Sequence, residues 1–275
     1  MTVHPDTERR SVEATIELPH SPDEVWRAST DASEIVKWFC FDAAIEPRRG
    51  GLVQLRWTDE FDWKYRIEEW EPGRHLRMVS PQQRADGPAL LALEWLLEGR
   101  GGGTVLRVVH SGFGYGAEWE DEVDGTRRGW HGELRNLRHY LARHRGTRRS
   151  VVWLLARTGV ATPEDLWGKL MGPEGLVAEG SLEGLAEGDR YRIRAATGEL
   201  VEGNVLVNAA PKDFAGTVLH LNDGIIRYGW EGSFGMLWLS TWGVDEREMD
   251  KFVAAWSDRM SRLLGRPPEV TRALG

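Results

Sequence analysis

A hexapeptide occurs twice in this chain, as Ser21-Pro22-Asp23-Glu24-Val25-Trp26 and again as Thr162-Pro163-Glu164-Asp165-Leu166-Trp167. All six positions agree in residue type. Each copy has the composition of a helix start, with a hydroxyl residue as N-cap, proline at the first helical position and acids in the first turn. The acid three residues after the N-cap resembles a capping box, although aspartate in the second copy is a short version of it. The sequence therefore predicts that a helix begins at the same point of two related segments.

A second block recurs near the end of each half. Its spacing is Trp-x3-apolar-x2-Leu, which places three large side chains on one face of a helix. The two trios are Trp130, Leu134 and Leu137, and Trp256, Met260 and Leu263. Two matched blocks in the same order predict an internal duplication. We expect two domains, residues 11–146 and residues 147–275, the second being a diverged and shortened copy.

Apolar and polar residues alternate through most of the first half, as they do in half-buried strands. One strand is expected over residues 11–18, and five more follow. Their apolar faces are Val53, Leu55 and Trp57; Trp63, Tyr65 and Ile67; Leu76 and Met78; Leu91, Leu93, Trp95 and Leu97; and Leu106, Val108 and His110. Short helices are expected over residues 22–29 and 32–38, and a long helix over residues 119–143.

Strands with one solvent-exposed face must bury their apolar face against another element. The long helix offers Trp130, Leu134, Leu137 and Leu141 as an inward stripe. We therefore predict an α+β fold, built of two tandem helix-grip modules. In each module a curved antiparallel sheet wraps around a long C-terminal helix, and a ligand would lie in the wedge between sheet and helix.

Composition narrows the functional classes. The chain has 275 residues and a formal net charge of -8, which speaks against a general nucleic-acid surface. No apolar run approaches the roughly 18–20 residues of a membrane span. Cys40 is the only cysteine, so no intrachain disulfide or cysteine-based metal site is expected. We expect a cytoplasmic protein.

The motifs of cofactor and metal chemistry are missing from the sequence. His131, His139 and His144 share a predicted helix but do not form an i, i+4 pair of ligands. The run Gly112-x-Gly114-x-Gly116 lacks the context of a phosphate-binding loop and is interpreted as the hinge into the long helix. We expect no metal, no cofactor and no nucleophile triad.

His110 is the one titratable side chain that alternation places on the inner face of a strand. An imidazole could serve there as acid, base or polar anchor, and a core histidine bonded to a neighbour is the alternative. It is the only candidate catalytic residue. Glu69 shares the phase of Trp63, Tyr65 and Ile67, but its place at the strand end favours solvent.

The inward aromatic residues have two interpretations, a packed core or the lining of a ligand site. The candidate ligand-binding residues are Trp57, Trp63, Tyr65, Trp95, His110, Phe113, Trp130 and Leu134. In the second half Leu200, Leu206, Leu219 and Leu221 suggest strands that are apolar on both faces, as do residues 234–242. Only His220 and Tyr228 are plausible inward polar groups there. This sheet is expected to pack extensively against the first domain or to form a homodimer.

The residues over Val12–Arg145 resemble a known family. The resemblance is carried by the first hexapeptide, the Trp38-Phe39 pair, the alternating hairpins, and Gly129-Trp130 followed by Leu134 and Leu137. They are similar to the SRPBCC superfamily (START-like, helix-grip) and within it to the activator of heat-shock-protein-ninety ATPase homologue family. The resemblance implies a helix-grip fold and, for many relatives, a cavity for an apolar small molecule. The segment before Val12 is too short for the separate chaperone-binding domain of eukaryotic chaperone activators, which leaves a chaperone partner unsupported.

These observations favour non-catalytic binding of an apolar or amphipathic small molecule between the sheet and helix of the first domain. One alternative is a cyclase- or hydrolase-like enzyme that uses His110 in the same place. Another is a chaperone-activator-like interaction protein, which would use its surface and keep a filled interior. A hydrophobic small molecule is thus the expected partner, and we expect no nucleic-acid partner and no membrane span.

Overall fold

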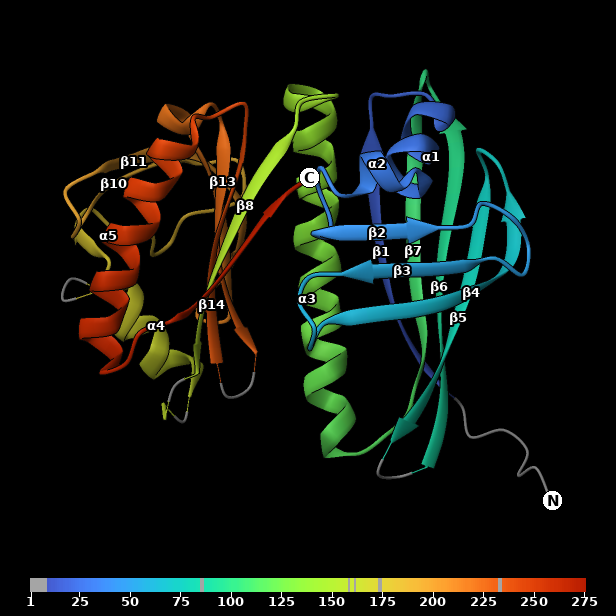
Figure 1. The fold of residues 1–275 in the computed structure, drawn as a ribbon, viewed down its shortest axis with the longest axis horizontal. Helices are drawn as coiled ribbons and strands as arrows, with labels where there is room; N and C mark the ends of the chain where they lie inside the picture. The colour runs from blue at the N-terminus through green and yellow to red at the C-terminus, as the bar shows by residue number, and fades with distance from the viewer. Residues whose placement is uncertain (1–8, 85–86, 158, 161, 173–174, 232–233) are drawn as a thin grey trace. The chain divides into compact units, whose positions relative to one another are not determined.

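The chain forms two compact units, residues 1–142 and residues 143–275, each with its own sheet and long helix (Figure 1). The computed structural model describes residues 9–84, 87–157, 159–160, 162–172, 175–231 and 234–275. Within these residues no helix is both long and apolar enough to cross a membrane.

The first unit is a seven-stranded antiparallel sheet with a long helix on one face (Figure 1). Its strands are β1 (Arg10–Leu18), β2 (Asp42–Ile45), β3 (Leu52–Arg56), β4 (Asp62–Glu71), β5 (His75–Arg84), β6 (Gly87–Arg100) and β7 (Gly103–Phe113). They lie in the order β1-β7-β6-β5-β4-β3-β2, so the first strand pairs with the last. The short strand β2 was not predicted because Asp42–Ile45 is too brief to show a period.

Helices connect and cover this sheet. The α1 helix (Pro22–Thr30) begins with the predicted capping box, in which Ser21 and Glu24 bond each other's backbone N–H groups. The α2 helix (Ala32–Ile35) is shorter than predicted and ends in turns before Trp38. The α3 helix (Ala117–His139) runs into a π-helical turn, η1 (Tyr140–His144).

The predicted inward stripe of α3 is confirmed. Trp130, Leu134, Leu137 and Leu141 are all buried. The glycine-rich hinge precedes the helix, and Gly116 adopts φ 115°, a value that only glycine accepts readily. At the other end the hydroxyl of Tyr140 donates to Glu34 Oε2 at 2.7 Å, which ties the end of α3 to α2.

The second unit repeats this order of elements. Its strands are β8 (Arg149–Arg157), β9 (Val177–Glu179), β10 (Arg190–Ala195), β11 (Leu200–Ala209), β12 (Asp213–Val218), β13 (Gly224–Glu231), β14 (Phe234–Trp242) and β15 (Glu269–Leu274). The sheet order is β15-β8-β14-β13-β12-β11-β10-β9. As in the first unit, the opening strand β8 pairs with β14, the strand that leads into the long helix.

The repeated helix starts are also present. The α4 helix (Pro163–Met171) follows β8, and its N-cap Thr162 accepts from the backbone N–H of Asp165. The α5 helix (Glu246–Leu264) buries Met249, Phe252, Val253, Trp256 and Met260. The shorter second copy retains a full set of strands and adds β15 at the edge of its sheet.

Two predictions for the second unit are wrong. Leu219 and His220 are exposed, because the chain leaves β12 at Val218 and makes a 3-10 turn, η2 (Leu219–Leu221). Tyr228 points inward as expected and is fully buried. Residues 235–242 of β14 are buried on both faces, as predicted. Whether a second copy of the chain covers the outer face stays a prediction.

Candidate functional site

The interior of the first unit contains a continuous set of aromatic side chains. We call it the inner aromatic cluster and define it as Phe39, Trp57, Trp63, Trp95, His110, Phe113 and Trp130. These residues come from the α2–β2 connection, the end of β3, the strands β4, β6 and β7, and the α3 helix. Ring centroids lie 4.8 Å apart for Trp57 and Trp63, 6.1 Å for Trp63 and His110, and 5.0 Å for His110 and Phe113. Trp130 stacks on Phe39 at 5.4 Å.

The structure brings the predicted ligand-binding residues together. Trp95, His110, Phe113, Trp130 and Leu134 are buried. Tyr65 is also buried, which raises the pKa of its phenol, and its ring lies 6.4 Å from that of Trp63. In contrast, Trp57 and Trp63 are only partly buried, so the cluster reaches the surface at the β3–β4 turn. Sequence reasoning missed Phe39 as a member, although it had singled out the Trp38-Phe39 pair.

His110 contacts three other members of this cluster, Trp63, Phe113 and Trp130. It is 4% exposed, and its Nδ1 accepts a hydrogen bond of 3.4 Å from the indole N–H of Trp130. A neutral imidazole has one donor and one acceptor nitrogen. Because Nδ1 accepts, the proton belongs on Nε2. That N–H has no hydrogen-bond partner among the described residues.

Trp95 carries a second donor of this kind. Its side chain is 1% exposed, and its indole N–H also has no partner within the described chain. Trp95 and His110 lie on β6 and β7 in diagonal register, since Leu93 pairs with His110 and Trp95 pairs with Val108. Diagonal neighbours on one face of a sheet lie within reach of long side chains. Two donors without a partner among the described residues therefore lie on adjacent strands, on one face of the sheet.

The environment of His110 also determines its charge. Burial lowers the pKa of His110 to about 4, so the imidazole is neutral near pH 7. Its acceptor nitrogen is occupied by Trp130 and its other nitrogen already holds a proton. In this arrangement the imidazole is a hydrogen-bond donor, and it lacks the free lone pair that a general base needs.

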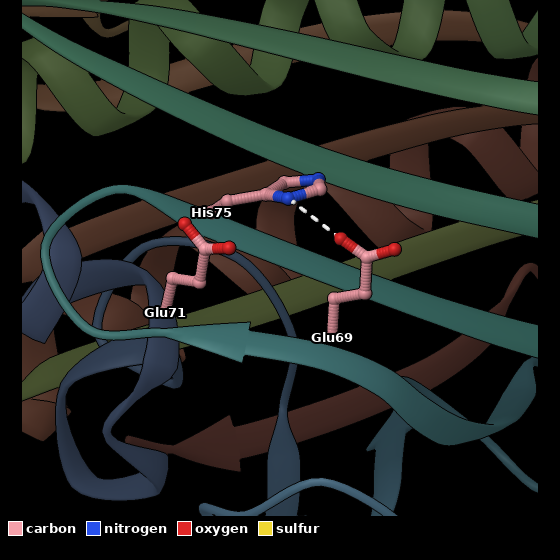
Figure 2. A group of neighbouring side chains, drawn as sticks. All are labelled: Glu69, Glu71 and His75. Atoms are coloured by element: carbon pink, nitrogen blue, oxygen red, sulfur yellow. Dashed lines mark ion pairs between the residues drawn. The ribbon is translucent and has the colours of Figure 1, made fainter.

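A second group of polar side chains lies at the β4–β5 hairpin (Figure 2). The possible ligand atoms of Glu69, Glu71 and His75 lie within 4.8 Å of one another. Glu71 and His75 are directly paired across the hairpin. Glu69 is exposed, as predicted, because an irregularity in the register between Ile67 and Glu69 turns it away from the inner face.

Histidine and carboxylates are suitable ligands for a divalent metal. Here, however, both ring nitrogens of His75 already face carboxylates. Its Nδ1 lies 3.1 Å from Glu69 Oε2, and its Nε2 lies 3.3 Å from Glu94 Oε2. Glu94 in turn pairs with Arg77 at 2.5 Å. Because both ring nitrogens face carboxylates and Glu94 also pairs with Arg77, we interpret the group as an ion-pair network that joins β4, β5 and β6.

In the second unit, the tryptophan that corresponds to Trp130 has a carboxylate as its partner. Trp256 lies at the position of α5 that corresponds to Trp130 of α3, and its indole N–H lies 3.3 Å from Glu199 Oε2. The buried hydroxyl of Tyr191 donates to the carbonyl of Thr217 at 2.7 Å. The interior of the first unit is therefore the better candidate for a ligand site.

The family match found by comparison with known proteins lies in the first unit. Residues 19–142 match the model of the family described as Activator of Hsp90 ATPase homolog 1-like protein. No curated protein matched the chain.

Several solved structures are similar to about half of the chain or to most of it. Protein MLL2253 from Mesorhizobium loti is 21% identical, with 48% of this chain and 97% of that chain covered and a TM-score of 0.43. The Aha1 dimer from Colwellia psychrerythraea is 16% identical, with 50% and 99% covered and a TM-score of 0.43. DynU16, from the dynemicin biosynthetic locus, is 15% identical, with 94% and 96% covered and a TM-score of 0.41.

Proposed function

We propose that the first unit, in which residues 19–142 match the model of the family described as Activator of Hsp90 ATPase homolog 1-like protein, binds an apolar small molecule without catalysing a reaction. The binding site is the inner aromatic cluster, between the sheet and α3. The molecule enters beside Trp57 and Trp63, where the cluster reaches the surface.

One observation carries the proposal: an aromatic interior holds two buried donors that have no partner among the described residues, the Nε2–H of His110 and the indole N–H of Trp95. Buried polar groups in folded proteins are nearly always hydrogen-bonded, and leaving one unpaired costs about 1–3 kcal/mol. A bound molecule that supplies an acceptor removes that cost. The surrounding rings supply the large apolar contact area that is typical of small-molecule sites.

The state of His110 favours binding over acid–base catalysis. Its pKa of about 4 leaves too little imidazolium near pH 7 for a general acid. Its acceptor nitrogen is engaged by Trp130 at 3.4 Å, which leaves it unsuited as a general base. The cyclase- or hydrolase-like alternative would need a rearranged imidazole.

Leu134 offers a test because it lies on the inward stripe of α3, one turn after Trp130, and is 1% exposed. The probe is N-phenyl-1-naphthylamine, a neutral apolar fluorophore whose emission rises on binding. We expect Leu134→Trp to weaken probe binding at least 10-fold, because the added ring occupies space at the inner face. Leu134→Ala is expected to bind the probe at least as tightly as the unmodified chain.

The matched control is Leu52→Trp, which introduces the same side chain at a position that is 51% exposed. It should leave probe affinity within about twofold, since surface changes have small effects. Thermal unfolding of each variant checks that the fold is retained. Equal probe affinity in all three variants would place the binding outside the cluster, and a protein-interaction role with a filled interior would then be the better account.

A further inference from the structure

The two unpartnered donors of the inner aromatic cluster restrict the chemistry of the ligand. We propose that the ligand is a neutral, largely aromatic or conjugated molecule with a carbonyl-type oxygen that accepts from His110 Nε2–H, with Trp95 Nε1–H as the second donor. This inference rests on the proposed function and adds to it the polar group by which the ligand is oriented.

The direction of the hydrogen bonds follows from Trp130. Because indole can only donate, its contact with Nδ1 fixes the imidazole as a donor at Nε2. Trp95 also can only donate. Both groups are thus N–H donors. A carbonyl oxygen accepts from both and adds no donor, whereas a hydroxyl or an amine with N–H groups brings a donor of its own that would need a further acceptor.

We infer that the ligand is uncharged because the inner aromatic cluster is apolar and largely buried. The members of the cluster are aromatic, and its one ionisable member, His110, is neutral because burial lowers its pKa to about 4. A carboxylate or phosphate at this place would lie among rings without a counter-charge, which is costly in an apolar interior. The carbonyl oxygen of a ketone, quinone or ester can accept from the same donors without the cost of burying a charge.

The geometry also favours a flat molecule. Trp95 and Trp130 have ring centroids 6.1 Å apart at an interplanar angle of 87°, and His110 and Trp130 lie 6.4 Å apart at 70°. The planes of the two donor rings thus both cross the plane of Trp130 at a steep angle. A planar conjugated ligand fits an interior lined by these rings, with its oxygen directed at His110 and Trp95 and its apolar part beside Trp63, whose ring contacts both His110 and Trp57.

Two probes of nearly equal shape test the inference on the full chain. Fluorenone carries a carbonyl oxygen where fluorene carries a methylene group, and both are flat and neutral. Affinities are measured by equilibrium dialysis. A hydrogen bond of ordinary net strength predicts that fluorenone binds about 10-fold more tightly than fluorene. In the nitrogen–proton spectrum, fluorenone but not fluorene should move the indole resonance of Trp95.

Variants separate the hydrogen bond from the apolar contact. His110→Phe keeps a ring but removes the donor, so the preference for fluorenone should fall to about threefold or less while fluorene binding persists. Trp95→Phe should reduce the preference in the same sense. Trp70→Phe is the control, because Trp70 is partly exposed and contacts Trp26 rather than the cluster.

The outcomes distinguish this inference from the function on which it rests. Equal binding of fluorenone and fluorene, or a preference that His110→Phe leaves unchanged, would overturn the carbonyl inference and leave apolar binding in place. Binding of neither probe would contradict the proposed function and the inference together. A preference that disappears only in the two donor variants is the result that we expect.

Discussion

His110 differs from an ordinary core histidine in having only one of its two nitrogens paired. Trp130 satisfies Nδ1, while Nε2–H faces the aromatic interior without a partner among the described residues. The alternation of β7 was sufficient to predict that His110 points inward. It could not predict the Trp130 contact, because that residue lies on another element, 20 positions further along the chain.

The neutral state of His110 makes the stability of the first unit depend on pH. The folded pKa of about 4 lies below the ordinary value of 6.5, so the unfolded chain takes up a proton first as pH falls. Stability is therefore complete above about pH 6.5 and is lost progressively toward pH 4. Between pH 7 and pH 5 the loss is about 2 kcal/mol.

Hydrogen exchange of peptides from β6 and β7 measures this effect, once intrinsic exchange rates are corrected for pH. The unmodified chain should lose about 2 kcal/mol more opening free energy than His110→Phe over the same pH interval. The pH profile of His110→Phe supplies the baseline, because all other titrating groups are present in both proteins. Parallel pH profiles in the two proteins would show that His110 titrates normally.

At the scale of elements, the β4–β5 hairpin shows where periodicity fails. Alternation alone assigned Glu69 the same face as Trp63, Tyr65 and Ile67, and only its place at the strand end favoured solvent. The break in register between Ile67 and Glu69 settles the matter by turning Glu69 outward. Such an irregularity depends on the pairing of two strands, so the sequence of one strand does not reveal it.

The network around His75 yields a prediction for this hairpin. The side chain of His75 is 17% exposed and lies between Glu69 and Glu94. His75→Ala should destabilise the first unit by about 1 kcal/mol, since part-buried charged hydrogen bonds are worth about that much. Arg74→Ala is the control in the same hairpin, because Arg74 is 79% exposed and its loss should cost under about 0.5 kcal/mol.

Zinc ions distinguish an ion-pair network from a metal site. If the network account holds, added Zn²⁺ shifts the thermal unfolding midpoint of the unmodified chain and of His75→Ala by the same amount. A zinc-dependent rise that vanishes in His75→Ala would mean that Glu69, Glu71 and His75 bind the metal instead.

At the scale of the whole molecule, duplication is the most informative feature of the sequence. Six residues at two helix starts and a trio on two long helices were enough to predict a repeated α+β module. The sheet orders agree with that prediction, since β1 pairs with β7 and β8 with β14. Short local signals succeed here because caps and inward stripes are set by neighbouring residues.

The candidate site could be predicted only in part. Alternation indicated which aromatic residues face inward, and those residues do meet in the first unit. It did not indicate which polar atoms lack partners, because that depends on contacts between distant segments. For the same reason sequence alone could not show that Trp256 of the second unit bonds Glu199, or that Trp95 of the first unit has no acceptor in the described part of the chain.

The central claim is that the first unit holds a neutral small molecule, and native mass spectrometry of the full chain tests it most directly. The chain is measured as purified and after incubation with a solvent extract of whole cells, beside Leu134→Trp. We predict a native mass that exceeds the denatured mass by one small molecule, with no excess in Leu134→Trp. Equal native and denatured masses of the unmodified chain in both preparations would contradict the claim.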